Sequence, residues 1–368
     1  MMSNIILGLL AIGVGMLMFH SLPRPVNRDE DATYPFVSII IPARNEAERI
    51  SSLLKSLQEQ NFRSCEVLVV DDHSTDATVS VASAFDATVL NNDSKAAGAG
   101  KSSACWHGVK HSKGEWLLFL DADTRLSNPD SLRDLLALYR RKGAKGILSL
   151  QPFHRIEDMY ENLSAIFNVI VVVGINVFTV WGKRFEPAGS FGPCILSNRA
   201  DYLSTGGHNG IQEAIMDDLA LGQAYLDQDL PVHCMGGKGV ISFRMYPEGF
   251  KSLVEGWCKS FALGSKATHP IVMLMTIIWI SGSFISTGAF ISSLIAMDLV
   301  LIVLTGVVYF LYALQTMIFA RRCGNFKRFI FIFHPILFSF FAGVFVYSIF
   351  RVYILRTVNW KGRKINVK

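Results

Sequence analysis

Short apolar runs alternate with amphipathic segments in the middle of the chain. Between residues 37 and 151, these runs are separated by segments in which apolar residues recur every three or four positions. The runs are typical of strands buried on both faces, and the spacing is typical of helices that cover a sheet. The expected strands are Val37–Ile41, Glu66–Val70, Thr88–Leu90, Glu115–Leu120 and Gly146–Leu150. The pattern therefore predicts an α/β fold with a mostly parallel sheet.

Longer apolar runs lie at both ends of the chain. The C-terminal ones are Ile271–Met297, Leu299–Ala320 and Phe329–Phe350. Each is long enough to cross a bilayer. The N-terminal run, Ile5–Phe19, is shorter and is followed by Arg24 and Arg28. Because positive charge favours the cytoplasmic side, we interpret this run as an anchor whose N-terminus lies outside, in a multi-pass protein of the cell membrane.

The topology of the C-terminus depends on whether all three runs cross. Three complete spans would place the tail 351–368, with its six Lys or Arg residues, outside the cell. That would contradict the preference of positive charge for the cytoplasm. His334-Pro335 and Gly343 allow a broken or re-entrant helix in the third run. We therefore expect that run to be the one that does not cross.

A fourth apolar run, Leu163–Trp181, separates two pairs of acidic residues. Asp121 and Asp123 precede it, and Asp217 and Asp218 follow it. A spanning helix would put the two pairs on opposite sides of the membrane. If the pairs share one site, the run lies in the membrane interface or lines an apolar groove.

These patterns divide the chain into four parts. They are an anchor and linker (1–35), an α/β domain (36–268, including the segment 163–181), membrane helices (269–350) and a basic cytoplasmic tail (351–368).

Composition supports a membrane protein with a cytoplasmic domain. Of the residues, 51% are hydrophobic and 18% are charged, and the mean hydropathy is +0.34. The net charge of +5 arises from ten Lys or Arg after Asp298, where no acidic residue follows. The basic excess thus flanks the membrane segments, which argues against a nucleic-acid-binding face. The six cysteines show no metal-ligand spacing and suit reduced thiols.

Polar residues follow three of the predicted strands. The strand ends read Pro42-Ala43-Arg44-Asn45-Glu46, Asp71-Asp72-His73-Ser74 and Asp121-Ala122-Asp123. Ligands of parallel sheets bind at the carboxyl ends of the strands, so these side chains are expected at one site. Each group taken alone is also explained by turn formation or helix capping.

The Asp-x-Asp sequence indicates a divalent cation. Carboxylates bind a hard cation that bridges two phosphates. Lys101 is placed to pair with a phosphate, and Asp71 or Asp72 to accept hydrogen bonds from a base or ribose. Gly100-Lys101-Ser102 is not a P-loop, because Lys95 occupies a position that requires glycine.

Several motifs together resemble family 2 glycosyltransferases with a GT-A fold. They are IIIPARNE (39–46), VVDDHSTD (69–76), Gly100-Lys101, FLDAD (119–123), DDLALG (217–222) and WKGR (360–363). The resemblance covers about residues 36–265 and the tail. It implies a GT-A nucleotide-sugar-binding domain and an inverting transfer from a nucleotide-diphospho-sugar.

The resemblance implies roles for the matching residues. The nucleotide-sugar-binding residues would be Pro42, Arg44, Glu46, Asp71, Asp72, Lys101 and Asp121. Asp123 would hold Mg²⁺ or Mn²⁺ on the diphosphate. The general base would come from Asp217-Asp218, where the family has Glu-Asp, and the register with Leu221-Gly222 favours Asp218.

A closer resemblance extends nearly from end to end. It rests on SLQPF (149–153), SAIFN (164–168), VGINVF (173–178), FGP (191–193), TGGH (205–208), FRMYPEG (243–249) and EGW (255–257). These segments are similar to those of glycosyltransferases that esterify a C30 carotenoid acid with glucose from UDP-glucose. The resemblance implies that substrate pair, and makes other enzymes of carotenoid biosynthesis candidate partners.

Four further residues are candidates for contact with the acceptor. Gly207 and His208 are expected in a flexible loop near the acceptor, with a structural role for His208 favoured over a catalytic one. Trp257 and Lys259 lie where the family has a Gln-x-x-Arg-Trp motif that this sequence lacks. The WKGR segment would pack back near the site or contact anionic lipid.

Other functions stay open at this point. The generic motifs also fit transfer to a polyprenyl phosphate, a hopanoid or sterol-like lipid or a glycerolipid hydroxyl. A non-catalytic nucleotide-sugar-binding membrane protein would have had no need to keep Asp123 and the acidic pair. A transporter would carry charged residues within its spans, and the three C-terminal runs contain none. The sugar, the metal and the oligomeric state are not determined by these patterns.

Overall fold

The computed structural model describes residues 1–25, 33–93, 100–212, 214, 216–264, 267–351, 357–360 and 363–366, without the side chains of residues 183, 259–263 and 357–366. The chain forms two compact units. The α/β unit comprises Pro23–His154 and Pro187–Arg244. The helical unit comprises Met1–Leu22, Arg155–Glu186 and Met245–Lys368. Residues 155–186 and 245–268 thus fold with the helices, whereas the sequence pattern placed them in the α/β domain.

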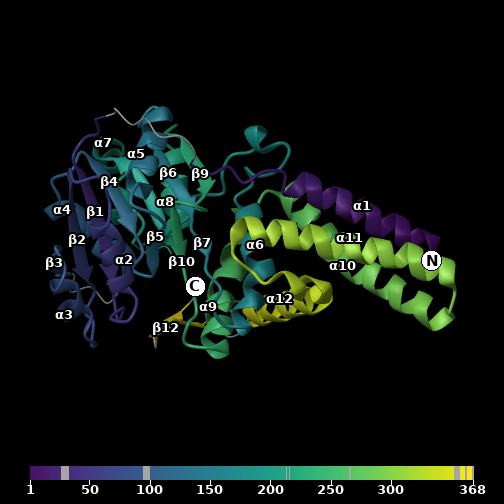
Figure 1. Cartoon of the computed structure of the whole chain (residues 1–368). Coiled ribbons are helices and arrows are strands. Elements are labelled where there is room, and N and C mark those ends of the chain that lie inside the picture. Colours follow the sequence, from purple (N-terminus) through teal and green to yellow (C-terminus); the bar gives the residue numbers. More distant parts are fainter. Residues whose placement is uncertain are drawn as a thin grey trace. The chain divides into compact units, whose positions relative to one another are not determined.

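A seven-stranded sheet with the order β3-β2-β1-β4-β8-β6-β9 forms the centre of the α/β unit (Figure 1). The strands are β1 (Val37–Ala43), β2 (Cys65–Asp71), β3 (Thr88–Asn91), β4 (Trp116–Leu120), β6 (Ile147–Gln151), β8 (Cys194–Asn198) and β9 (Val232–Gly236). Only β8 pairs in antiparallel fashion, with β4 and β6. The prediction of a mostly parallel sheet is confirmed, and all five predicted strands belong to it.

Helices cover both faces of this sheet. On one face, Ile39 and Ile41 of β1 join a core with Leu53 of α2 (Ile50–Gln58). On the other face, a Cβ on Gly108 of α4 (Lys101–His111) would lie 2.6 Å from Cγ2 of Ile40. The remaining helices of the unit are α3 (Thr78–Ser83), α5 (Ser131–Arg141), α7 (Arg199–Ser204), η3 (Gly207–Asn209) and α8 (Asp217–Leu226). Burial on both faces explains why the strands are continuous apolar runs.

A second, three-stranded sheet fixes the position of the Asp-x-Asp turn. Its order is β5 (Thr124–Leu126), β10 (Ile241–Phe243) and β7 (Phe153–His154). The backbone N–H and the hydroxyl of Thr124 donate to the carbonyl of Asp121 over 3.0 and 2.7 Å. Asp121 and Asp123 therefore lie on a hydrogen-bonded turn between β4 and β5.

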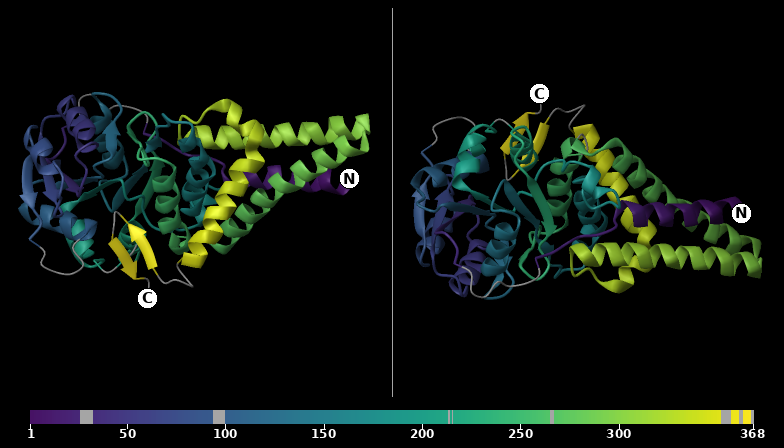
Figure 2. Two further views of the ribbon diagram at one scale, coloured as in Figure 1. Left: turned by 90° about the horizontal axis from the view of Figure 1, so that it is seen from below. Right: turned by 90° about the horizontal axis from the view of Figure 1, so that it is seen from above.

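Three long helices run side by side in the helical unit (Figures 1 and 2). They are α1 (Met2–Met18), α10 (Pro270–Ala296) and α11 (Leu299–Cys323). Trp279 Nε1 donates to Gln315 Oε1 over 3.0 Å, and Gln315 Nε2 donates to the carbonyl of Ile12 over 2.7 Å. In the described part of the chain, three helical segments have the length and apolar composition to cross a membrane, namely α10, α11 and Arg328–Ile349. These segments coincide with the three predicted C-terminal runs.

Shorter elements complete the helical unit. They are η1 (Tyr160–Ser164), α6 (Ala165–Gly174), η2 (Gly182–Arg184), α9 (Phe250–Gly264), η5 (Arg328–Phe333), α12 (His334–Ile349) and the strand pair β11 (Thr357–Trp360) and β12 (Arg363–Asn366).

The third C-terminal run is broken, as its sequence predicts. The 3₁₀ helix η5 ends at Phe333, and α12 begins at His334 with Pro335 in its first turn. The break lies halfway along the bundle, because His334 Nδ1 is 2.7 Å from the hydroxyl of Ser283 at the centre of α10.

Both ends of this run return to the same elements. At its start, the Lys327 N–H donates to Asn162 of η1, and at its end Ser348 donates to the carbonyl of Cys258 in α9. Trp257 of α9 is itself hydrogen-bonded to Ser164 beside η1. Within the helical unit, residues 328–349 therefore enter the bundle to its midpoint and come back.

The run Leu163–Trp181 does not form one long helix. Its helix, α6, has ten residues and is about 15 Å long, half the thickness of the hydrocarbon core of a bilayer. Ile166, Phe167 and Val169 are fully buried, and α6 packs against α10, α11 and α12. The structure thus supports the interpretation that this run is not a membrane span, and shows most of its side chains as packing residues.

Candidate active site

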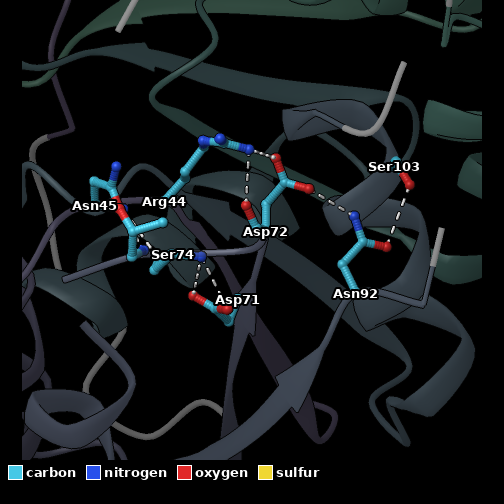
Figure 3. Close-up of polar contacts among 8 residues, drawn as sticks. Arg44, Asn45, Asp71, Asp72, Ser74, Asn92 and Ser103 are labelled. Carbon is cyan, nitrogen blue, oxygen red and sulfur yellow. Dashed lines mark hydrogen bonds and ion pairs between the residues drawn. The ribbon is translucent and has the colours of Figure 1, made fainter. Parts of the chain in front are cut away.

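One group of polar side chains joins the carboxyl ends of β1, β2 and β3 (Figure 3). Arg44 Nη1 donates to the carbonyl of Asp72 over 3.1 Å and lies 3.6 Å from Oδ2 of the same residue. Asn92 Nδ2 donates to Oδ1 of Asp72 over 3.0 Å. The hydroxyl of Ser103, on α4, donates to Asn92 Oδ1 over 3.3 Å. Asp72 is buried and has a partner on each carboxylate oxygen, so it holds Arg44 and Asn92 in place.

The other predicted nucleotide-binding residues lie at the same edge. Asp71 accepts hydrogen bonds from the backbone N–H of Ser74, at 3.2 and 3.3 Å, and so closes the turn after β2. Glu46 is buried, with Oε2 3.4 Å from Arg49 Nε. Pro42 pairs with Val70 across β1 and β2. The structure therefore brings five of the predicted nucleotide-sugar-binding residues together at this edge, namely Pro42, Arg44, Glu46, Asp71 and Asp72.

A second group is formed around Lys101, the first residue of α4. Lys101 Nζ lies 2.7 Å from Asp121 Oδ1 and donates to the carbonyl of Gly192 over 3.3 Å. A Cβ on Gly192 would lie 3.2 Å from that Nζ and 3.3 Å from Asp218 Oδ2. Asp217 and Asp218 open α8. One cation thus faces carboxylates from the end of β4 and the start of α8, although Asp121 and Asp218 are 97 positions apart in the sequence.

The electrostatics of this half-buried group follow from partial desolvation and from the charges that face one another in it. Desolvation by itself disfavours the charged form of Lys101, but the attraction of Asp121 and then of Asp217 outweighs it, and the pKa of Lys101 is raised. Desolvation and the neighbouring Asp217 raise the pKa of Asp218 to about 6, against the opposing effect of Lys101. Lys101 is therefore charged at neutral pH, whereas Asp218 titrates just below it.

The raised pKa of Asp218 predicts a pH dependence of stability. Between about pH 4 and pH 6 the folded state keeps a proton that the unfolded state loses, so this carboxyl lowers the free energy of unfolding as the pH rises. Asp218→Asn removes this decrease in the free energy of unfolding. The Tm of this variant relative to wild type should rise from pH 4 to pH 6 and stay level above. Asp227→Asn, at the exposed end of α8, is the control, and a parallel response of both variants would contradict the assignment.

Two glycines allow α8 to approach the loop before β8. A Cβ on Gly189 would lie 2.5 Å from the Cα of Leu219, and a Cβ on Gly222 would lie 2.5 Å from the backbone of Gly189 and Ser190. The hydroxyl of Ser190 donates to the carbonyl of Asp218 over 2.8 Å. This close contact places Asp218 beside Gly192 and Lys101.

Gly222→Ala should therefore destabilise the protein. Alanine normally favours a helix over glycine by about 1 kcal/mol. Here the added methyl group meets backbone, and we expect a net loss of about 1–3 kcal/mol. The matched control is Gly210→Ala, whose Cβ would have no neighbour closer than 3.7 Å. The Tm by calorimetry should fall by several degrees for Gly222→Ala only, and equal Tm values would refute the close-contact argument.

Asp123 lies on the turn after β4, half-buried and two residues from Asp121. The described residues contain no group of three or more His, Cys, Asp or Glu side chains arranged to hold a metal ion. Mg²⁺ and related cations are commonly held by one or two carboxylates together with substrate phosphates. The donor set of this turn fits that mode, in which the nucleotide supplies the remaining ligands.

Gly207 and His208 lie in η3, a short helix rather than the expected flexible loop. His208 is buried, and its Nδ1 is 2.9 Å from the hydroxyl of Tyr202. Its ring centroid lies 4.9 Å from that of Phe119 in β4. Burial lowers the pKa of His208 to about 4, so the ring is neutral at pH 7. These contacts favour the structural role for His208 over contact with an acceptor.

Trp257 belongs to the helical unit. It is buried, its Nε1 donates to Ser164 over 3.0 Å, and its ring stacks on Phe167 at 4.9 Å. These contacts give Trp257 a packing role between α9 and α6. The side chain of Lys259 lies outside the described residues, as do the side chains of the WKGR segment.

Three residues of the site were not predicted individually from the sequence. Asn92 and Ser103 complete the network around Asp72. The carbonyl of Gly192 binds Lys101. Asn92 directly follows β3, so the argument from strand ends would have found it. Ser103 and Gly192 carry no comparable signal, because their positions depend on how α4 and the loop before β8 pack.

The chain is similar to known proteins over nearly its whole length. The family model described as "Glycosyl transferase family 2" matches residues 38–189. The chain is 36% identical over 360 residues to a 4,4'-diaponeurosporenoate glycosyltransferase of Staphylococcus aureus strain N315, covering 97% of this chain and 96% of that protein. The chain belongs to glycosyl transferase family 2. The protein of the same name from S. aureus strain MRSA252 is 37% identical over 361 residues, covering 97% of this glycosyltransferase and 96% of that protein.

A solved structure confirms the fold of this glycosyltransferase. The mannosyltransferase PcManGT from Pyrobaculum calidifontis, in complex with GDP-Man and Mn²⁺, superposes with a TM-score of 0.58. The match covers 94% of this chain and 97% of that one, at 17% sequence identity. The α/β unit therefore has the GT-A fold that the motifs predicted.

Proposed function

We propose that this glycosyltransferase transfers glucose from UDP-glucose to the carboxylate of a C30 carotenoid acid and forms a glucosyl ester. The observation that carries the proposal is the similarity to diaponeurosporenoate glycosyltransferases over 97% of the chain. That range includes the helical unit as well as the α/β unit. The similarity to these glycosyltransferases would therefore include an acceptor-binding region outside the GT-A fold.

The donor is assigned to the two polar groups of the α/β unit. Arg44 and Asn92, held by Asp72, offer hydrogen bonds to a nucleoside at the end of β1 to β3. Ser103 and Lys101 both lie in the first turn of α4, so this helix connects the nucleoside end with the charged end. In this assignment, Lys101 pairs with the diphosphate and Asp121 with the sugar or ribose hydroxyls.

A divalent cation is part of this proposal. Asp123, with Asp121 beside it on the turn, would hold Mg²⁺ or Mn²⁺, and PcManGT was solved with Mn²⁺. When bound, the cation neutralises charge on the departing diphosphate. Lys101 supports the same charge from the protein side, since its ammonium stays protonated in this setting.

The reaction is a single displacement at the anomeric carbon. A carboxylate oxygen of the acceptor forms a bond to that carbon, and the bond to UDP breaks, with UDP keeping the electron pair. The acceptor has an ordinary pKa near 4 and is already ionised at neutral pH, so no base is needed. Asp218 and Asp217 then orient the sugar or the acceptor instead of removing a proton.

The membrane location follows from the nature of the acceptor. A C30 polyene partitions into lipid, and the helical unit carries segments that suit a bilayer. We assign the α/β unit and the basic tail to the cytoplasmic side of the cell membrane. The positive charges of Arg321, Arg322 and Lys327 favour the same side.

Product analysis tests the proposal. Membranes containing the protein are incubated with UDP-glucose, Mg²⁺ or Mn²⁺ and a C30 carotenoid acid, and the products are examined by mass spectrometry. The expected result is a hexosyl ester that dilute base cleaves. Parallel incubations use a polyprenyl phosphate, a hopanoid and a diacylglycerol. Transfer to one of these and none to the carotenoid acid would overturn the assignment.

A further inference from the structure

An apolar groove lies within the helical unit between α9 and α12, which lie side by side (Figures 1 and 2). Its volume is about 380 Å³, within the range of about 300–1,000 Å³ of small-molecule sites. The groove is lined by Val254, Ser339, Phe340, Gly343, Val344 and Tyr347. Trp257, the predicted acceptor residue, is buried one turn beyond Val254 on α9 and is not among the lining residues.

Gly343 keeps this groove open. Glycine in the middle of a helix is less favourable than alanine. At Gly15 and Gly282 in the same unit, a Cβ would lie 2.7 and 2.2 Å from a neighbouring side chain, so packing requires glycine there. At Gly343 a Cβ would meet nothing within 4 Å, and its φ is not in the left-handed region. The absence of a side chain at Gly343 leaves space in the groove, and no packing contact requires glycine there.

A cation lies at one end of the groove. Phe340, Val344, Tyr347 and Arg351 follow one another at helical spacing, so they share a face of α12 and its continuation. Arg351 Nη1 donates to the hydroxyl of Tyr347 over 3.1 Å. Its Nε is buried and has no hydrogen-bond partner among the described residues. A buried donor without a partner is unfavourable, and a carboxylate is the partner that a guanidinium binds best.

We propose that this groove binds the part of the polyene next to the carboxyl group of the carotenoid acid and that Arg351 binds the carboxylate. The identity of the acceptor rests on the proposed function. An apolar groove with the guanidinium of Arg351 at one end matches a ligand that is an apolar chain with one carboxylate. A bilayer phospholipid matches less well, because it has two chains and a bulky phosphodiester head.

Direct binding tests the groove. The full-length protein in detergent micelles is titrated with the C30 carotenoid acid, without UDP-glucose, and binding is followed by the absorbance shift of the polyene and the quenching of tryptophan fluorescence. Gly343→Leu, which fills the groove, should weaken binding at least tenfold. The matched control is Gly288→Leu, an exposed glycine of α10 whose Cβ would also meet nothing within 4 Å. Equal affinities of wild type and Gly343→Leu would overturn the proposal.

A second comparison tests Arg351. Arg351→Gln should weaken binding of the acid at least tenfold but leave binding of its methyl ester unchanged, and Arg351→Lys should restore part of the loss. Weakening of acid and ester alike would show that Arg351 only stabilises the fold. Displacement of the carotenoid by excess phospholipid would assign the groove to bilayer lipid. Because no sugar donor is present, a protein that binds the acid but transfers no glucose would overturn the proposed function and leave this inference intact.

Discussion

Lys101→Met is expected to lower kcat by about 10²–10³-fold, the loss typical of removing one preorganised electrostatic contact to a developing anion. Among the described residues, Lys101 is the one cation in contact with Asp121. Its Nζ lies 2.7 Å from the carboxylate. Methionine keeps the length and apolar part of the side chain but removes the charge. On the proposed function, the variant loses the positive charge that supports the leaving diphosphate. It also removes the charge that offsets the mutual repulsion of three carboxylates of the site.

The control for this variant lies on the same helix. Lys110 is exposed near the end of α4, and Lys110→Met makes the same substitution at a position outside the site. Activity is measured with saturating UDP-glucose and carotenoid acid, and folding is checked by calorimetry. Wild-type kcat in a folded Lys101→Met variant would remove Lys101 from the site. A further rise of the pKa of Asp218 in the variant is a second expected result, since Lys101 lowers it.

Asp123→Asn and Asp218→Asn are expected to differ strongly. Asparagine at position 123 removes a carboxylate of the turn that we propose to hold the cation, and we expect a loss of about 10³-fold or more. With a carboxylate acceptor, no proton has to be removed, so Asp218→Asn should cost only about tenfold, far below the contribution of about 10²–10⁴ that a general base makes.

The acceptor itself provides the control for this pair. Initial rates are compared for a carotenoid acid and for a lipid alcohol that the wild type accepts, at several metal concentrations. Asp218→Asn should be more damaging with the alcohol, whose proton must leave, and added metal should partly rescue Asp123→Asn only. Equal losses for both variants with the carotenoid acid, in folded protein, would contradict the distinction.

The strands of the sheet were predictable because each carries its own signal. β1, β2, β4 and β6 are apolar runs that are buried on both faces, and local sequence is enough to recognise them. The place of β8 between β4 and β6 was not predictable in this way. Its antiparallel pairing depends on residues 194–198 returning after the excursion of residues 155–186 into the helical unit.

The two groups of polar residues in the site also differ in how far local sequence predicts them. Arg44, Asp71 and Asp72 follow strands that are neighbours in the sheet, so the rule for strand ends places them together. The meeting of Lys101 with Asp218 has no local signal. It requires the close packing of α8 on the loop before β8, which Gly189 and Gly222 permit.

The amino-acid sequence by itself determined the parallel sheet, the apolar segments, the family and the carboxylates at the strand ends, since each of these depends on a short stretch of residues. Only the tertiary structure decided which side chains share the charge of Lys101, that His208 is a buried packing residue, and that the break in residues 328–349 lies at the middle of the bundle. Each of these is a contact between segments far apart along the chain, and such contacts depend on how whole elements pack.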